Sequence, residues 1–112
     1  MARVLADSER MFGPSARQRY AALFVAAIRD VASEPARPGS HREVDVSGDL
    51  RTYHIGHSRF RIPTDIGRVK SPRHALVYTV AADGVVDVLG IIHERMDRTD
   101  ALRRIVALST EN

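Results

Sequence analysis

The sequence contains no cysteine, which excludes a disulfide framework and a thiolate metal site. No apolar run approaches the roughly 18 residues that a membrane-spanning helix needs. Residues 1–7, MARVLAD, have no apolar core of signal-peptide length and end on a charge. These absences predict a cytoplasmic protein with no membrane partner.

Lysine is also scarce, since Lys70 is the single lysine among 17 basic residues and the rest are arginine. The net charge of +3 favours nucleic acid or an acidic partner without distinguishing between them. The distribution of charge is more informative than the total. One basic cluster is opposed locally only by Asp65, and it consists of Arg59, Arg61, Arg68, Lys70 and Arg73.

Two helices are predicted first. Residues 3–12 form one, and Gly13-Pro14 ends it because glycine takes the left-handed conformation and proline cannot continue a helix. The second begins at Ser15, which fits a capping box with Gln18. Its apolar residues recur at helical spacing and are Ala16, Tyr20, Leu23, Phe24, Ala27, Ile28 and Val31. These helices predict an antiparallel hairpin that packs on a sheet. Tyr20, Leu23 and Phe24 are expected in the core.

Strands are predicted in the second half of the chain. Residues 34–48 are rich in proline, glycine and serine, which indicates a linker. Branched and aromatic residues predict strands at 50–55 and 74–80, separated by a long basic loop at 56–73. Asp83-Gly84 is the dipeptide that a type I′ hairpin turn prefers.

Residues 85–92 form the predicted third strand, whose near-continuous apolarity favours an interior strand covered on at least one face. Residues 98–107 predict a short C-terminal helix with Leu102, Ile105 and Val106 inward. A single α+β domain, residues 1–112, is therefore expected. It consists of an N-terminal helix hairpin packed on one face of a three-stranded antiparallel meander, followed by the short helix.

Six short motifs occur in a characteristic order. They are Phe12-Gly13, Ala16 with Tyr20, Ile28 and Ala32 ahead of the linker Pro35-Ala36-Arg37-Pro38-Gly39-Ser40, Leu50-Arg51-Thr52-Tyr53-His54, Pro72-Arg73-His74, and Ile91-Ile92-His93-Glu94-Arg95-Met96-Asp97. In this order they resemble the ParE-like branch of the RelE/ParE superfamily of toxins from type II toxin–antitoxin systems. The resemblance covers about residues 4–105.

One feature departs from that family. Its members normally begin with a strand before the helix hairpin, and residues 1–3 are too few for a strand of about five residues. We expect either a true start further upstream or an open sheet edge that a partner strand fills. An isolated chain of this kind is expected to be marginally folded and stabilised by its partner.

The resemblance implies a toxin that inhibits DNA gyrase without catalysis and so blocks replication, a role linked to plasmid stabilisation. It implies a heteromer with the cognate antitoxin, as a heterotetramer or a larger assembly. It also implies no cofactor, no metal and no sequence-specific nucleic-acid binding by the toxin alone.

A RelE-like ribosome-dependent mRNA endoribonuclease is the alternative function, and an inactive relic that still binds antitoxin is another. RelE-type enzymes resemble one another in a lysine and arginine cluster with a tyrosine near the C-terminus. The tail after Asp97 has no tyrosine, and arginine is a poor general base because it stays protonated. Arg51, Arg73 and Arg95 remain able to bind phosphate, but no catalytic residue is predicted.

The five histidines do not predict a metal site. His54 and His57 are three apart, a spacing that points side chains to opposite faces of a strand. His93 is expected to be a strand-end residue that hydrogen-bonds the backbone.

Three interpretations fit the basic loop. It is able to touch nucleic acid, with Phe60 available for stacking, or to be a solvated insertion. We favour a third, in which arginine side chains dock an acidic antitoxin tail. The residues predicted to bind antitoxin or target are Arg51, Tyr53, Arg59, Arg61, Arg68, Lys70, Arg73 and Arg95.

Overall fold

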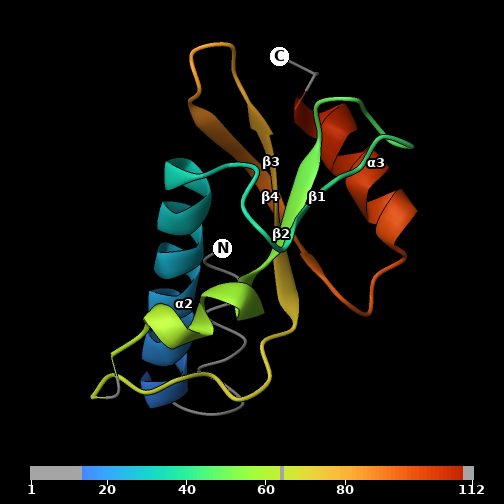
Figure 1. Cartoon of the computed structure of the whole chain (residues 1–112). Helices are drawn as coiled ribbons and strands as arrows, with labels where there is room; N and C mark the ends of the chain where they lie inside the picture. Colours follow the sequence, from blue (N-terminus) through green and yellow to red (C-terminus); the bar gives the residue numbers. More distant parts are fainter. Residues whose placement is uncertain (1–13, 64, 110–112) are drawn as a thin grey trace.

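The computed structural model describes residues 14–63 and 65–109. The elements follow in the order α2 (Pro14–Ser33), β1 (Ser40–Arg42), β2 (Arg51–His54), the 3-10 helix η1 (Ile55–Arg61), β3 (His74–Val80), β4 (Val86–His93) and α3 (Arg98–Ser109). This arrangement confirms the α+β class (Figure 1). The predicted helix at 3–12 and the question of a preceding strand lie outside the described residues.

The four strands form one antiparallel sheet in the order β1-β2-β3-β4. The meander of β2, β3 and β4 is as predicted, but the sheet has four strands because the linker supplies β1. Gly39, at φ +95, lies immediately before β1, and Ser40 then pairs with Tyr53. A Cβ atom at Gly39 would lie 2.8 Å from the ring of His57, so glycine is required there for space as well as for conformation.

Helix α2 covers one face of the sheet. It begins at Pro14, one residue before the predicted N-cap Ser15, as suits the preference of proline for a first helical turn. Its predicted apolar stripe is confirmed, since Leu23 and Phe24 are fully buried in one core cluster. The sheet contributes its two largest buried residues, Tyr53 and Tyr78, to the same cluster.

Helix α3, for which the sequence predicted no particular face, packs on the face of the sheet opposite to α2 (Figure 1). The alternation of side chains along β3 explains this arrangement. Leu76 and Tyr78 belong to the cluster under α2, whereas Ala75 and Val77 belong to the cluster with Leu102 of α3. A strand that is apolar at consecutive positions must be covered twice.

Strand β4 was predicted to be interior, but within the described residues it is an edge strand. Its long apolar run serves contacts on both faces, because Ile91 packs against the α2 cluster and Ile92 is buried in the α3 cluster. The register with β3 shifts between Val77 and Tyr78, which reflects a β-bulge. The sequence therefore indicated how β4 is covered but not its place in the sheet.

The β3–β4 hairpin is confirmed, but its turn is not type I′. That turn requires positive φ at both central residues, and Gly84 is the only residue of the hairpin loop with positive φ. Gly84 N donates to Ala81 O (2.9 Å), and Ala81 N donates to Val85 O (2.9 Å). The connection is therefore a three-residue loop that ends in a left-handed glycine.

A polar network fixes the start of the predicted long loop, where the chain forms η1. The phenol of Tyr53 donates to Ser58 Oγ (2.8 Å), because Ser58 Oγ itself donates to Asp30 Oδ2 (2.6 Å). Arg37 and Arg61 lie 3.3 and 3.5 Å from Asp30 Oδ1. One carboxylate thus joins α2, the linker and η1.

Candidate functional site

The basic loop presents two arginines over an exposed aromatic ring. The Cζ atoms of Arg59 and Arg68 each lie 5.4 Å from the ring centroid of Phe60, whose side chain is 74% exposed. A guanidinium stacked on a ring keeps its in-plane N–H donors available. The arrangement therefore holds two cations ready for an acidic partner, and a base that stacked on Phe60 would have to displace them.

The loop is less strongly basic than the sequence indicated. Asp65 was expected to be its only local counter-charge, but Asp30 of α2 lies 3.5 Å from Arg61. The side chains of Arg68 and Lys70 are exposed. The positive potential is consequently concentrated at Arg59, Arg68 and Lys70.

Two other predicted contact residues face the α2 side of the sheet. Tyr53 is fully buried, and its phenol is used within the core, so its side chain is not on a surface that a partner contacts. Arg51 is half-buried and lies beside Arg42 in a groove described below.

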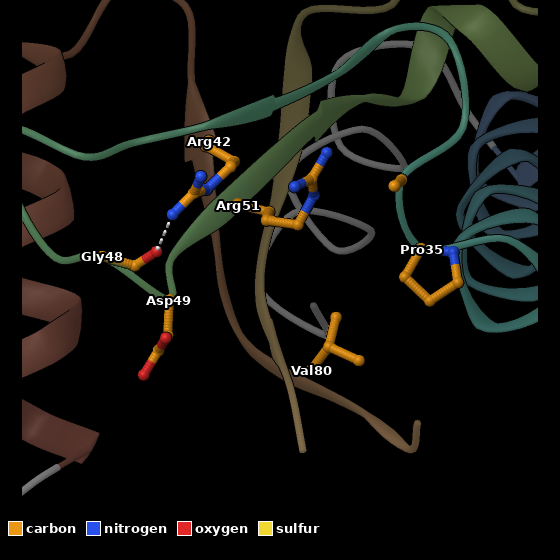
Figure 2. Close-up of a pocket in the computed structure, with 7 residues that line it drawn as sticks. Pro35, Arg42, Gly48, Asp49, Arg51 and Val80 are labelled. Atoms are coloured by element: carbon orange, nitrogen blue, oxygen red, sulfur yellow. Dashed lines mark hydrogen bonds between the residues drawn. The ribbon is translucent and has the colours of Figure 1, made fainter. Parts of the chain in front are cut away.

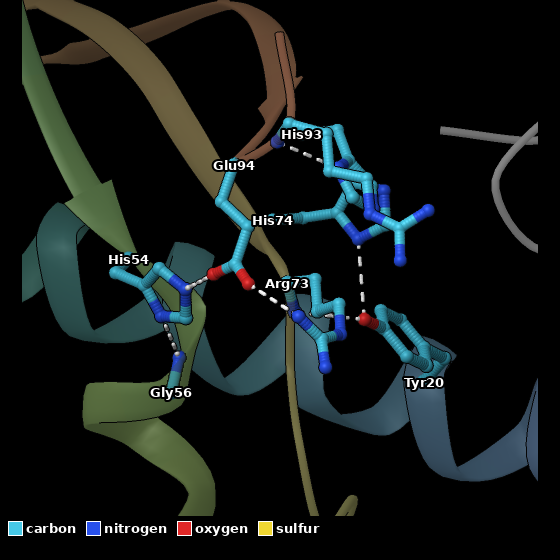
Figure 3. Close-up of polar contacts among 8 residues, drawn as sticks. Tyr20, His54, Gly56, Arg73, His74, His93 and Glu94 are labelled. Carbon is cyan, nitrogen blue, oxygen red and sulfur yellow. Dashed lines mark hydrogen bonds and ion pairs between the residues drawn. The ribbon is translucent and has the colours of Figure 1, made fainter.

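A second polar cluster lies near helix α2, where β2 and β4 end and β3 begins (Figure 3). Arg73 Nη1 donates to Glu94 Oε1 (2.7 Å), and His54 Nε2 lies 3.5 Å from Glu94 Oε2. Desolvation acts to raise the pKa of Glu94, but the hydrogen bonds and charges of Arg73 and His54 lower it overall. Arg73 is therefore neutralised within the molecule.

Tyr20 and His74 form the inner part of this cluster (Figure 3). Arg73 N donates to the phenol oxygen of Tyr20 (3.1 Å), and the same oxygen is hydrogen-bonded to His74 Nδ1 (3.1 Å). Burial, and then the charges of His93 and His54, lower the pKa of His74 from 6.5 to about 4. His74 is accordingly neutral near pH 7.

His93 confirms the role expected of it, because its Nδ1 accepts a hydrogen bond from Arg95 N (2.9 Å) just after the strand ends. Its ring lies 4.8 Å from that of His74 in a T-shaped arrangement. The rings of His54 and His57 lie 6.4 Å apart, so the expectation of opposite faces was wrong. The reason is that β2 ends at His54 and His57 lies in η1.

A cavity of about 120 Å³ lies beside this cluster, on the sheet face that carries α3. Its lining consists of His54, Arg73, Ala75, Ile92, His93, Glu94, Met96 and Arg98. Arg98 is itself held by Glu43 and donates to Thr52 Oγ1 (2.7 Å). Within residues 14–63 and 65–109, no group of three or more histidine or acidic side chains is placed to hold a metal ion.

The sequence did not identify this cluster as a unit, although two of the motifs that form it were recognised. The motifs at Pro72-Arg73-His74 and at His93-Glu94-Arg95 were noted separately. A hairpin centred on Asp83-Gly84 pairs His74 with His93, as the structure does. The contact with Tyr20 had no comparable signal, because it depends on how α2 is placed on the sheet.

None of the described helices is both long enough and apolar enough to cross a membrane.

Acidification is expected to destabilise the fold partly through His74. Because its folded pKa is lowered from 6.5 to about 4, its contribution is complete above pH 6.5 and is lost as the pH falls towards 4. His74→Phe should therefore flatten the decline of the thermal midpoint between pH 6.5 and 4. The substitution should not abolish the decline, because burial also lowers the pKa of His57.

Thermal unfolding of wild type and variant across this pH range is the measurement, and His41→Gln at an exposed position is the control. Parallel pH profiles for wild type and His74→Phe would contradict the assignment.

Comparison with known families identifies one match, to the family described as "ParE toxin of type II toxin-antitoxin system, parDE", over residues 2–98. No curated protein and no solved structure matches the chain significantly. Membership of a ParE toxin family implies an antitoxin partner. The chain therefore belongs to the ParE toxin family and is the toxin component of a type II toxin–antitoxin system.

Proposed function

We propose that this toxin acts in the cytoplasm as a non-catalytic inhibitor of DNA gyrase, and that its antitoxin neutralises it within a heterotetramer or a larger complex. Such a pair would stabilise the plasmid that carries it. The observation that carries the proposal, beside membership of the ParE family, is that the polar cluster at the strand ends is engaged with itself.

An acid–base nuclease needs a base and an acid that are free to reach the ribose and the phosphate. Here Arg73 is paired with Glu94, and the phenol of Tyr20 is committed to His74. Arg98 is paired with Glu43. Helix α3, which follows the cluster, contains no tyrosine and no lysine. These contacts favour a binding protein over a ribonuclease.

One observation favours a ribosome-dependent endoribonuclease as the second candidate. The same small cavity is lined by two histidines and two arginines, namely His54, His93, Arg73 and Arg98. Imidazole is the usual general acid or base near neutral pH, and guanidinium binds phosphate. A nuclease would use His93, which belongs to the cavity lining and whose Nδ1 accepts a hydrogen bond from the backbone.

Two assays on the same purified toxin separate these functions. We expect inhibition of gyrase supercoiling or trapping of cleaved DNA, with mRNA on translating ribosomes left intact. His93→Asn removes the candidate acid or base. The variant should retain the gyrase effect, because a non-catalytic inhibitor needs neither. Cleavage of ribosome-bound mRNA that His93→Asn abolishes, with gyrase unaffected, would establish the second candidate instead.

We also propose that the basic loop docks an acidic segment of the antitoxin. Arg59 and Arg68 are already ordered over Phe60, so less side-chain entropy is lost when they pair with carboxylates. Lys70 adds a third cation, which is exposed like Arg68, whereas Arg61 is partly neutralised by Asp30. Exposed charges of this kind act mainly on the rate of association.

Replacing Arg59, Arg68 and Lys70 together with glutamine should slow association with the antitoxin. The wild-type rate should fall steeply with added salt, and the rate of the variant should fall much less. The matched control replaces three exposed arginines elsewhere, Arg29, Arg103 and Arg104, with glutamine. Stopped-flow or surface-binding kinetics measure the association rate of each variant with the antitoxin. Equal association rates and equal salt dependence for the two variants would show that the loop is only a solvated insertion.

A further inference from the structure

A groove with a volume of about 350 Å³ lies on the side of the sheet that faces α2 (Figure 2). One wall comes from the segment after α2 and from β3, and it is apolar. The other side comes from β1, β2 and the turn between them, and it is charged. The lining residues are Pro35, Ala36, Arg42, Gly48, Asp49, Arg51 and Val80.

Two arginines face each other across the first strand pair of the sheet. Arg42 of β1 and Arg51 of β2 are register partners, and directly opposed residues of an antiparallel pair point to the same face. Like charges in this position destabilise a sheet. The pair therefore needs a compensating contact.

The described residues supply neutral acceptors but no counter-charge for this pair. Arg42 Nη2 donates to Gly48 O (3.1 Å), and Arg51 Nη2 donates to Ser40 Oγ (2.7 Å). Among the described residues no carboxylate forms an ion pair with either arginine. Asp49 belongs to the lining of the same groove but does not reach them. The Nε atom of Arg51 is buried with no hydrogen-bond partner.

A buried donor without a partner costs free energy, and so does an uncompensated pair of cations. Arg42 and Arg51 carry both costs within one groove. An anionic group bound there would compensate the paired cations, because the guanidinium fork matches a carboxylate in a bidentate geometry. The charge and the hydrogen-bond donors of the groove therefore suit an anion.

We propose that this groove binds a carboxylate side chain of an acidic protein segment, with an apolar side chain of the same segment against Pro35, Ala36 and Val80. The antitoxin is the protein expected to supply the segment, so the assignment of the occupant rests on the proposed neutralisation. A nucleic acid fits less well, since a phosphate chain has no use for an apolar wall. The groove and the basic loop would then be two separate contacts for one acidic partner.

Peptide binding tests the chemistry of the groove. The probes are an acetylated octapeptide of alternating leucine and glutamate, a matched peptide with glutamine in place of glutamate, and single-stranded oligothymidine of eight nucleotides. The glutamate peptide should bind wild-type toxin, and Arg51→Gln or Arg42→Gln should weaken it about tenfold, the factor that corresponds to one charge-assisted hydrogen bond. Arg104→Gln, at an exposed position outside the groove, should bind like wild type.

Three outcomes would overturn the proposal: equal binding of the glutamate and glutamine peptides, tighter binding of the oligonucleotide, or peptide binding that neither groove variant alters. Fluorescence anisotropy with labelled probes resolves all three.

The stability of the free toxin provides a second readout. If the two arginines serve only the fold, Arg42→Gln should lower the thermal midpoint. If they serve a ligand, Arg42→Gln relieves the repulsion within the pair, so the midpoint should stay level or rise while peptide binding weakens. A lowered midpoint together with unchanged binding would contradict the proposal. These results do not depend on the gyrase assay, so failure of the gyrase proposal and failure of the groove proposal are distinguishable.

Discussion

Strand β3 is apolar at consecutive positions, and the rest of the architecture depends on burying both of its faces. Leu76 and Tyr78 point to α2, while Ala75 and Val77 point to α3. Neither helix alone would remove this strand from water, because adjacent side chains of a strand point in opposite directions. The helices must therefore lie on opposite sides of the sheet.

Covering both faces restricts where function is placed. In the part of the chain that the structure describes, the groove beside β1 and β2, the strand-end cavity and the basic loop are open to other molecules, and arginines lie at each of these places. Arg73 at the strand ends is neutralised by Glu94, and Arg98 is neutralised by Glu43. The pair Arg42 and Arg51 and the stacked Arg59 and Arg68 have neutral or aromatic partners. The cations without internal carboxylates are the ones that fit an acidic partner, which is the chemistry expected of an antitoxin.

The sequence predicted features that depend on local periodicity and missed those that depend on packing between distant segments. The stripe of α2 and the C-terminal helix follow from spacing, and the strands of the meander follow from their branched, aromatic and apolar residues. Strand β1 was missed because its three residues lie in a segment with linker composition, and only pairing with β2 makes them a strand. Tyr53 was predicted to be a contact residue because its motif gives no indication of how deeply the side chain is buried. The hydrogen bond between Tyr20 and His74 spans 54 residues and has no local signal.

Hydrogen–deuterium exchange of the toxin, alone and in complex with its antitoxin, tests most directly the claim that the unneutralised cations form the antitoxin-binding surface. The account predicts antitoxin-dependent protection of backbone amides in residues 40–51, beside the groove, and in residues 56–70 of the basic loop. Residues 93–98, at the strand-end cavity, should change little. Protection confined to residues 93–98, with none in the other two segments, would contradict the account.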